Sequence, residues 1–387
     1  MLNSILDNDL YKLTMQYAVV RLFPRSRVRF QFINRGGTEF PDGFAEELRK
    51  LVFGMSALSL TDEEYNYLNK RCYYLAPTYL DFLRGYRYDP SEIGIIQNGG
   101  KLNISIEGYW YRTILWEVPI MAMVSELFFK MTGQKGISKN EVIEKAAKKA
   151  ATFKMGGIQV ADFGTRRRFS YENHDLVVKT LKDYGSQSFI GTSNVHLAMR
   201  YNVLPIGTHA HEWFMFHSAK YGFQMANKLA LEHWVDVYRG DLGIALSDTF
   251  TTDIFFQSFD KKFAKLFDGV RQDSGDPILF AEKTIKHYKS LNIDPLTKTI
   301  IFSDSLDTEK ALKIADFCRN KIKTSFGIGT NITNDVGVTP LNMVIKLVDV
   351  KAEGREWTPV IKLSDTPGKH SGDLEMIDLC KKTLRIS

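Results

Sequence analysis

The stretch KTIIFSDSLDTEKALKIADFCRNKIKTSFGIGT, residues 298–330, decides the fold class. It contains two short apolar runs, TIIF and TSFGIG, with the helix-like segment SLDTEKALKIADFCRN between them. Apolar runs of this length that end in small or polar residues are typical of buried strands. Two strands that are joined through a helix pair in parallel with a right-handed crossover, so this stretch predicts one unit of a parallel α/β sheet.

The same rhythm continues outward over most of the chain from about residue 155. Together with the two runs above, eight apolar segments alternate with amphipathic stretches. The other six are GIQVADFG (157–164), SQSFIGTS (186–193), VLPIGTHAH (203–211), LGIALSDT (242–249), FDGVRQDSGD (267–276) and NMVIKLV (342–348). Eight such units predict an α/β fold with a closed (β/α)8 barrel, and an open doubly wound sheet is the alternative.

Residues 1 to about 120 have a different pattern. Strand-like runs such as RVRFQFIN and LNISIEGYW are mixed there with helical segments such as TDEEYNYLNKRCYYL. This mixture predicts a separate α+β unit. Farther along, Ser138 and Glu141 form a capping box at the start of a helix whose solvent-facing residues include EKAAKKAATFK.

The overall composition limits the possible partners and compartments. A net charge of +6 over 387 residues suits anionic small substrates and is too small for a nucleic-acid footprint. The longest apolar runs are too short for a membrane span, and Asp7, Asp9 and Lys12 interrupt the place of a signal peptide. We therefore expect a cytoplasmic protein with no nucleic-acid or membrane partner. Its three cysteines are far apart and suggest neither disulfides nor a zinc site.

Polar residues end most of the candidate strands. In a barrel, the carboxyl ends of the strands meet at one face, where the active site is assembled. The residues in this position are Asp162, Thr192, His209, His211, Asp248, Arg271, Asp273, Asp304 and Gly327. They are expected to line one mouth of the barrel.

The stretch FGIGTNITND, residues 326–335, is a candidate phosphate site. Two glycines after a strand let the backbone turn and expose N–H groups, and a helix that begins near Asn331 would add its positive end. A phosphate site after the seventh strand recurs in barrels, and FSDS ends the neighbouring strand. We expect a phosphate cradle here, with a plain turn as the alternative.

Two more stretches place cations beside other binding groups. In GVRQDSGDP, Arg271 can bind an anion, and Asp273 can accept hydrogen bonds from ribose-like hydroxyls or hold hydrated Mg2+. In VADFGTRRRFS, Phe163 and Arg166 can place a ring and a guanidinium around a flat anionic ligand. The next two arginines are interpreted as solvated. The letters DFG do not indicate a protein kinase, because the HRD and GxGxxG motifs are absent.

Three histidines lie close together in PIGTHAHEWFMFH, residues 205–217. If this segment is a strand, His209 and His211 face the same way and could share a metal ion. However, no cysteine or clear third ligand accompanies them. The other interpretation is a neutral imidazole that accepts a phosphoryl group on nitrogen.

Eight blocks of the sequence, taken together, resemble nicotinate phosphoribosyltransferases. They are DNDLYKLTMQYA, DFGTRRR, GTSNVHLA, GTHAHEW, GVRQDSGDP, FSDSLD, SFGIGTNITND and KLSDTPGK, in the order and approximate spacing of that family. The resemblance implies an irregular (β/α)8-type barrel at 126–345 and an N-terminal α/β domain at 1–125. It also implies that the C-terminal segment, 346–387, packs back on the N-terminal domain.

The resemblance further implies an enzyme of NAD salvage. Such enzymes transfer the 5-phosphoribosyl group from phosphoribosyl pyrophosphate to nicotinate in the presence of Mg2+, and they release pyrophosphate. They couple this transfer to hydrolysis of ATP through a phosphorylated histidine, and the matching position here is His211. His209 and His217 have no such match, and the Mg2+ ligands and the place of the adenine of ATP stay open.

Other residues match the family by position. Phe163 resembles one side of an aromatic sandwich around the pyridine ring, and Tyr11 resembles the other side, contributed by the neighbouring subunit, which implies a homodimer with shared active sites. Arg166 and Arg271 match residues that meet anionic parts of the substrates, and Asp273 matches the carboxylate on the ribose side. The residues that match the site of the 5′-phosphate are Ser303, Asp304, Gly327, Gly329 and Thr330.

The block GTSNVHLA, which contains Thr192 and Ser193, bears on the choice of base. Relatives that use nicotinamide carry an acidic residue in this loop, where this chain has Ser193. A carboxylate would repel nicotinate, whereas a hydroxyl can donate to it, so nicotinate is favoured. The open alternatives are a nicotinamide-specific or quinolinate-using phosphoribosyltransferase and a non-catalytic barrel that binds a phosphosugar.

Overall fold

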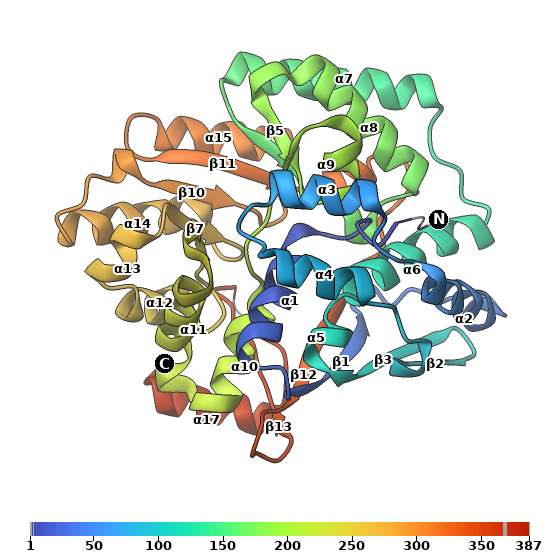
Figure 1. Cartoon of the computed structure of the whole chain (residues 1–387). Helices are drawn as coiled ribbons and strands as arrows, with labels where there is room; N and C mark the ends of the chain where they lie inside the picture. The colour runs from blue at the N-terminus through green and yellow to red at the C-terminus, as the bar shows by residue number, and fades with distance from the viewer. Residues whose placement is uncertain (1, 3, 367–369, 387) are drawn as a thin grey trace.

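Two β-sheets form the framework of the chain (Figure 1). The computed structural model describes residues 2, 4–366 and 370–386. The antiparallel sheet has the order β13 (Thr358–Pro359), β12 (Met343–Lys351), β1 (Arg27–Asn34), β3 (Lys101–Tyr109), β2 (Ile93–Asn98). The parallel sheet has the order β6 (Leu204–Pro205), β5 (Phe189–Thr192), β4 (Val160–Asp162), β11 (Lys323–Ile328), β10 (Thr299–Phe302), β9 (Gly269–Gln272), β8 (Ile244–Leu246). A further short strand, β7 (Arg239–Leu242), lies outside both sheets.

The unit predicted from residues 298–330 is present. Strand β10 leads through helix α15 (Thr308–Cys318) to β11, and the two strands pair in parallel with Thr299 opposite Lys323. Helix α15 begins with Asp307, whose side chain accepts the backbone N–H of Lys310 and caps the helix. The prediction of a parallel α/β sheet is therefore confirmed.

Seven of the eight predicted barrel strands join the parallel sheet, but the prediction for the eighth is wrong. NMVIKLV forms most of β12, which pairs antiparallel with β1 in the other sheet. The side chains of β12 alternate between buried and half-buried, as is typical of an antiparallel strand with one covered face. The parallel sheet is thus curled rather than closed, and between its end strands the Thr208 hydroxyl donates to the carbonyl of Ile244 (2.9 Å).

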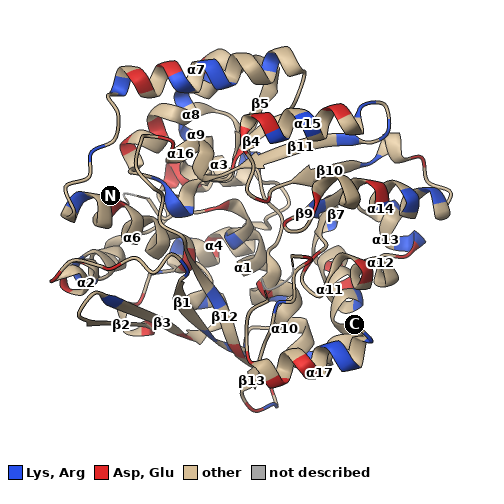
Figure 2. Ribbon diagram, turned by 180° about the vertical axis from the view of Figure 1, so that it is seen from behind, with Lys and Arg blue, Asp and Glu red and all other residues tan. Residues whose placement is uncertain are grey.

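Helices cover the outer face of the curled sheet and the space between the sheets. Helix α7 (Lys139–Gly156) starts with the predicted capping box of Ser138 and Glu141, and charges of both signs follow one another along it in Figure 2. Each helix among the described residues is too short or too polar to cross a membrane. The other helices are α1 (Leu10–Leu22), α2 (Phe44–Gly54), α3 (Asp62–Arg71), α4 (Pro77–Gly85), α5 (Trp110–Thr113), α6 (Glu117–Met131), α8 (Tyr171–Gly185), α9 (Val195–Tyr201), α10 (His211–Tyr221), α11 (Phe223–Tyr238), α12 (Thr252–Ser258), α13 (Lys261–Leu266), α14 (Pro277–Ser290), α16 (Thr330–Thr333) and α17 (Leu374–Leu384).

Helix α1 lies between the two sheets in Figure 1, and buried polar contacts fix its first turn against β5. Arg168 donates to both carboxylate oxygens of Asp7 (2.7 and 2.8 Å), and Leu10 N–H donates to the carbonyl of Ser193 (2.8 Å). Both members of the ion pair are almost fully buried, so the expectation that Arg168 is solvated is wrong. Removing one member of such a pair costs about 3–5 kcal/mol, because the other charge stays buried without a partner.

Helix α10 is fixed from the side of the antiparallel domain. Phe216 stacks on Trp110 with ring centroids 4.3 Å apart, and Glu212 accepts from the ammonium of Lys12 on α1 (2.7 Å). The same ammonium contacts Glu117 at the start of α6 (2.6 Å). These contacts hold the first residue of α10, His211, close to the first turns of α1 and α6.

Candidate active site

A cavity of about 340 Å³ lies inside the curled sheet, near the carboxyl ends of its strands and next to the start of α1. Eight of the residues expected in the site or at the mouth of the barrel line it, namely Tyr11, Phe163, Arg166, Ser193, His209, His211, Arg271 and Asp273. The described residues that line it do not include Thr192, Ser303, Asp304, Gly327, Gly329 or Thr330. The Thr192 hydroxyl instead donates to Asp162 (2.6 Å), and both side chains are fully buried.

The cavity has an aromatic side chain on each of two elements. Phe163 follows β4, and Tyr11 lies in the first turn of α1 of the same chain. Both rings therefore line one cavity of one chain, and the contribution of Tyr11 from a neighbouring subunit stays a prediction. Burial raises the pKa of the Tyr11 hydroxyl, and Glu117 raises it further, so the phenol is neutral at pH 7.

Gly327 on β11 leaves the space that the Phe163 ring occupies. A Cβ atom at position 327 would lie 2.3 Å from Cδ2 and 2.4 Å from Cε2 of Phe163. This glycine was predicted as part of a phosphate cradle, and its close neighbour is an aromatic ring. The helix expected near Asn331 is α16, a single turn of four residues.

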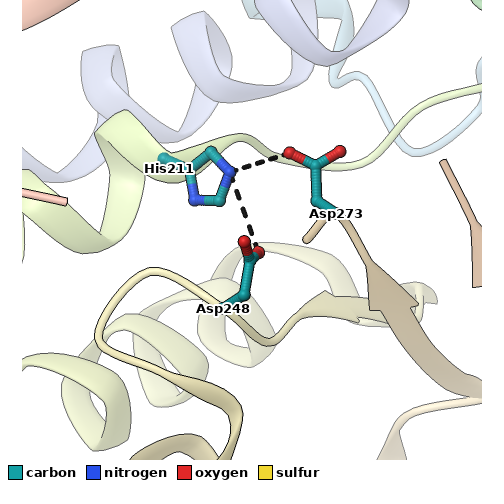
Figure 3. Close-up of side chains that lie close together, drawn as sticks. All are labelled: His211, Asp248 and Asp273. Carbon is teal, nitrogen blue, oxygen red and sulfur yellow. Dashed lines mark hydrogen bonds and ion pairs between the residues drawn. The ribbon is translucent and has the colours of Figure 1, made fainter. Parts of the chain in front are cut away.

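His211, at the start of α10, lies beside two carboxylates, Asp248 and Asp273, which Figure 3 shows, and beside the ammonium of Lys362. Its Nε2 atom is 3.0 Å from Asp273 Oδ2, 3.8 Å from Asp248 Oδ1 and 2.8 Å from Lys362 Nζ. Its Nδ1 atom is 3.0 Å from the hydroxyl of Thr249. Nε2 thus faces two carboxylates and an ammonium, while Nδ1 faces a hydroxyl.

Burial, more than the charges around it, keeps the imidazole of His211 neutral. Burial lowers the pKa of His211, and the Lys362 ammonium lowers it further, although Asp248 and Asp273 oppose this. Burial alone would raise the pKa of Asp273, but Arg271, His211 and Lys362 hold it well below the ordinary value. At pH 7 the site therefore combines an ionised Asp273 with a neutral, nucleophilic imidazole.

Asp273 connects β9 to the end of β10. Its Oδ1 atom accepts from the Ser303 hydroxyl (2.8 Å) and lies 3.4 Å from Arg271 Nη1. Arg271 also donates to the carbonyl of His209 (3.1 Å). Ser303 thus contacts the site through Asp273, while the neighbouring Asp304 accepts from Ser305 (3.0 Å).

A group of cations near His211 was not predicted from the sequence. Burial lowers the pKa of Lys346 on β12 to about 7, and Arg35 and Lys362 lower it further. Burial also lowers the pKa of Arg167 to about 10, with Arg166 and Arg35 adding to the effect. We call Arg35, Arg167, Lys346 and Lys362 the cationic cluster. Cations that depress one another's pKa are typical of a site that binds an anion.

Asp9 was also missed, although it is part of the block DNDLYKLTM. Its side chain lines the cavity, and its Oδ1 atom accepts from the Ser193 hydroxyl (2.7 Å). The Ser193 proton is therefore directed at Asp9 and not at a ligand. Burial raises the pKa of Asp9, although Arg166 opposes this.

The other two histidines of the 205–217 segment have structural contacts. The Nε2 atom of His209 accepts the backbone N–H of Leu246 (3.2 Å), and its pKa is held well below the ordinary value by burial. His217 donates through Nδ1 to the carbonyl of Trp213 (2.6 Å), and its Nε2 meets His233 (2.9 Å). His209 and His211 therefore do not form a shared metal site, in contrast to the interpretation of this segment as a strand.

Comparisons with known proteins cover nearly the whole chain. The model of the nicotinate phosphoribosyltransferase (NAPRTase) family matches residues 158–387, and the model of its N-terminal domain matches residues 6–125. A nicotinate phosphoribosyltransferase of Chromohalobacter salexigens is 60% identical over 387 residues, which are 100% of this chain and 99% of that protein. The crystal structure of nicotinate phosphoribosyltransferase from Porphyromonas gingivalis is 47% identical, with a TM-score of 0.97 and full coverage of both chains. A structure from Saccharomyces cerevisiae, titled a putative nicotinate phosphoribosyltransferase, is 34% identical with a TM-score of 0.94 and covers 100% of this chain and 99% of its own.

Proposed function

The chain belongs to the nicotinate phosphoribosyltransferase family, and from this premise we propose how its own residues carry out the reaction. The enzyme transfers the 5-phosphoribosyl group of phosphoribosyl pyrophosphate to nicotinate, and the products are nicotinate mononucleotide and pyrophosphate, a step of NAD salvage. The observation that carries the assignment of roles is the cavity that has Phe163, Tyr11, Arg166 and His211 on its walls.

The pyridine ring of nicotinate lies between Phe163 and Tyr11 in this proposal. Both rings belong to the cavity, and Gly327 allows Phe163 to occupy its position. Stacking holds the ring nitrogen in line with the sugar, which is the positioning that an attacking group requires. Arg166, which lines the same cavity, meets the carboxylate of the base.

Phosphoribosyl pyrophosphate binds in the part of the cavity that His211 and Asp273 line. As the bond from the anomeric carbon to pyrophosphate breaks, its electron pair leaves with pyrophosphate and positive charge develops on the ribose. The ionised Asp273 stabilises this charge and accepts from ribose hydroxyls, while the cationic cluster and Arg271 neutralise the leaving group. The ring nitrogen of nicotinate then supplies its lone pair to the anomeric carbon, so no general base is needed.

The 5′-phosphate is assigned to the ends of β10 and β11. Ser303, Asp304, Gly329 and Thr330 follow these neighbouring parallel strands. Backbone N–H groups after the strands and the hydroxyl of Thr330 are suited to phosphate oxygens, while the Ser303 hydroxyl donates to Asp273 (2.8 Å). The Thr192 hydroxyl donates to Asp162, so Thr192 stabilises the protein around the site and does not bind the ligand.

His211 is the phosphoryl acceptor for ATP. The lone pair of a neutral ring nitrogen attacks the γ-phosphorus, and the bond to the β–γ bridging oxygen breaks as ADP leaves with that electron pair. Asp273, 3.0 Å from Nε2, stabilises the positive charge that forms on the imidazole. Water later cleaves the nitrogen–phosphorus bond and releases phosphate. The added negative charge next to the cationic cluster couples ATP hydrolysis to binding and release of the substrates.

Mg2+ fits the carboxylates beside His211. Asp248 Oδ1 accepts no hydrogen bond from any described residue, and ligand atoms of His211, Asp248 and Asp273 lie within 4.8 Å of one another. Asp248 and Asp273 would hold the ion, because Mg2+ prefers carboxylate oxygens, and the ion would screen the charge of pyrophosphate. When no ion is bound, the ammonium of Lys362, 3.1 Å from Asp248, supplies positive charge beside these carboxylates.

We also propose the division of the chain into residues 1–125, 126–345 and 346–387. The pairing of β12 with β1 supports the return of the last segment to the N-terminal domain. In this proposal the chain forms a homodimer, as the resemblance implies, and each chain supplies both rings of its own site, because Tyr11 and Phe163 line one cavity of one chain.

Release of pyrophosphate tests the reaction. The protein is incubated with phosphoribosyl pyrophosphate and Mg2+ and with nicotinate, nicotinamide or quinolinate, each with and without ATP. We expect pyrophosphate with nicotinate and more of it when ATP is present. Equal rates with nicotinamide would favour the amide-using alternative, and no pyrophosphate with any base would favour a barrel that only binds a phosphosugar.

A further inference from the structure

Asp9 is placed in the cavity in an unusual way for a residue that begins a helix. It is the N-cap residue of α1, but its side chain makes no capping hydrogen bond to that helix. Asp276 and Asp307, by contrast, cap α14 and α15 through their carboxylates. Asp9 is only 2% exposed and lines the cavity next to Tyr11. Its carboxyl group is therefore directed at the place where the base binds in the proposed function.

The cation that faces the Asp9 carboxyl group is shared with another acid. Arg166 faces Asp9, but it also contacts Glu117 (3.4 Å) at the start of α6. The other titratable groups around Asp9 are acidic, namely Asp162 at the end of β4 and Tyr11 on α1. Burial and Asp162 raise the pKa of Asp9, whereas Arg166 and hydrogen bonds from the Thr165 and Ser193 hydroxyls lower it, and the net direction is upward.

Ser193 cannot be the donor that distinguishes nicotinate from nicotinamide while its proton is directed at Asp9 (2.7 Å). A second carboxylate that enters this buried space beside Asp9 makes it unfavourable for both groups to be ionised. One proton shared between two carboxyl groups removes this repulsion and forms a strong hydrogen bond. The contact then becomes attractive for an acid.

Resting on the proposed function, we propose that Asp9 selects nicotinate as the base, because its carboxyl group takes up one proton and donates it to the carboxylate of nicotinate beside Arg166. The proton comes from solvent when the base binds and returns when the product leaves. Nicotinamide requires no such uptake, because its NH2 group donates to the ionised Asp9.

This inference has a defined dependence on pH. Where free Asp9 is ionised and bound Asp9 is protonated, the affinity for nicotinate falls about tenfold for each unit of increasing pH. The affinity for nicotinamide does not follow this slope. The preference for nicotinate over nicotinamide therefore decreases as the pH rises.

The test compares Asp9→Asn and Asp9→Ala with the wild-type enzyme, with Asp276→Asn as a matched control at the N-cap of α14. An amide at position 9 still donates to nicotinate but cannot titrate. We expect Asp9→Asn to keep nicotinate binding without the pH slope of KM, and Asp9→Ala to raise KM about 10- to 100-fold. Lys346 also titrates near pH 7, but it is present in all variants, so the difference between profiles isolates Asp9.

Calorimetry of nicotinate binding to the wild-type enzyme gives a second measurement that needs no variant. Titrations in two buffers with different ionisation enthalpies count the protons taken up, and we expect a count that approaches one above the pKa of Asp9. A count of zero, or the same pH slope in Asp9→Asn as in wild type, overturns the role of Asp9 even if the enzyme transfers phosphoribose to nicotinate. No transfer to nicotinate by the wild type overturns the proposed function itself.

Discussion

A methyl group at position 327 collides with the Phe163 ring. The variant Gly327→Ala therefore tests whether Phe163, one of the two rings proposed to hold the base, needs the space that this glycine leaves. The new Cβ atom would lie 2.3 Å from Phe163 Cδ2. To reach even 3.0 Å the ring must move by about 0.7 Å, in a region that is close-packed. A displacement of this size at a clamp reduces catalytic efficiency by about 10- to 100-fold, and overpacking costs about 1–3 kcal/mol of stability.

Steady-state kinetics with nicotinate and phosphoribosyl pyrophosphate as separately varied substrates measures this effect. We expect the KM for nicotinate to rise and the KM for phosphoribosyl pyrophosphate to stay near the wild-type value. Gly85→Ala at the end of α4 is the matched control, because nothing lies within 4 Å of the place that its new methyl group would occupy. An unchanged KM for nicotinate, or a rise only for phosphoribosyl pyrophosphate, would refute the clamp and favour a phosphate contact for Gly327.

Three other experiments, which use four variants, test separate parts of the site. His211→Asn is expected to abolish the stimulation by ATP while slow transfer without ATP persists, and a variant with full stimulation would exclude His211 as the acceptor. Mixing Tyr11→Ala and Arg271→Ala chains should give no recovered activity if both residues act within one chain, as proposed; recovery under proven subunit exchange would contradict this and favour a clamp shared between subunits. Burial, Arg35 and Lys362 lower the pKa of Lys346 to about 7. The loss of stability that its charge causes is therefore greatest below that pH and decreases as the pH rises toward the ordinary pKa of lysine. Lys346→Met should therefore raise Tm more at pH 6 than at pH 9, and it should weaken binding of phosphoribosyl pyrophosphate. An equal change of Tm at both pH values would show that neighbouring cations and burial do not lower the pKa of this lysine.

Local patterns predicted the parallel sheet because each strand and helix there carries its own signal. The apolar run of β10, the cap at Asp307 and the amphipathic α15 are all encoded within about 30 residues of one another. The partner of a strand is not encoded in this way. The run of β12 is as apolar as its predecessors, but it pairs with β1, which is more than 300 positions earlier in the chain.

The residue types of the site could be predicted from the sequence, but their contacts could not. Motifs indicated four of the residues, because the chemistry of each side chain follows from its type: Phe163, Arg166, His211 and Asp273. The contact of Ser193 with Asp9 spans 184 positions, and only the fold shows that the serine proton is already used. Sequence alone also gives no means to decide whether Tyr11 serves its own chain or a neighbour.

The cationic cluster had no sequence signal of its own. Its members come from separate segments, and Lys346 and Lys362 each stand between two apolar residues, as a lysine on the exposed face of a strand does. Lys362 contacts His211, and Lys346 on β12 lies close enough to Lys362 to feel its charge, because β12 lies in the antiparallel sheet and not in the curled one. The wrong assignment of the eighth strand therefore also concealed these two lysines.

A crystal structure of the enzyme with nicotinate mononucleotide and pyrophosphate tests the assembled site most directly. We expect the pyridine ring between Phe163 and Tyr11 of one chain, its carboxylate within hydrogen-bonding distance of Asp9 and Arg166, and pyrophosphate against Lys346 and Lys362. A pyridine ring outside this cavity, or one stacked on the Tyr11 of a second subunit, would contradict the account.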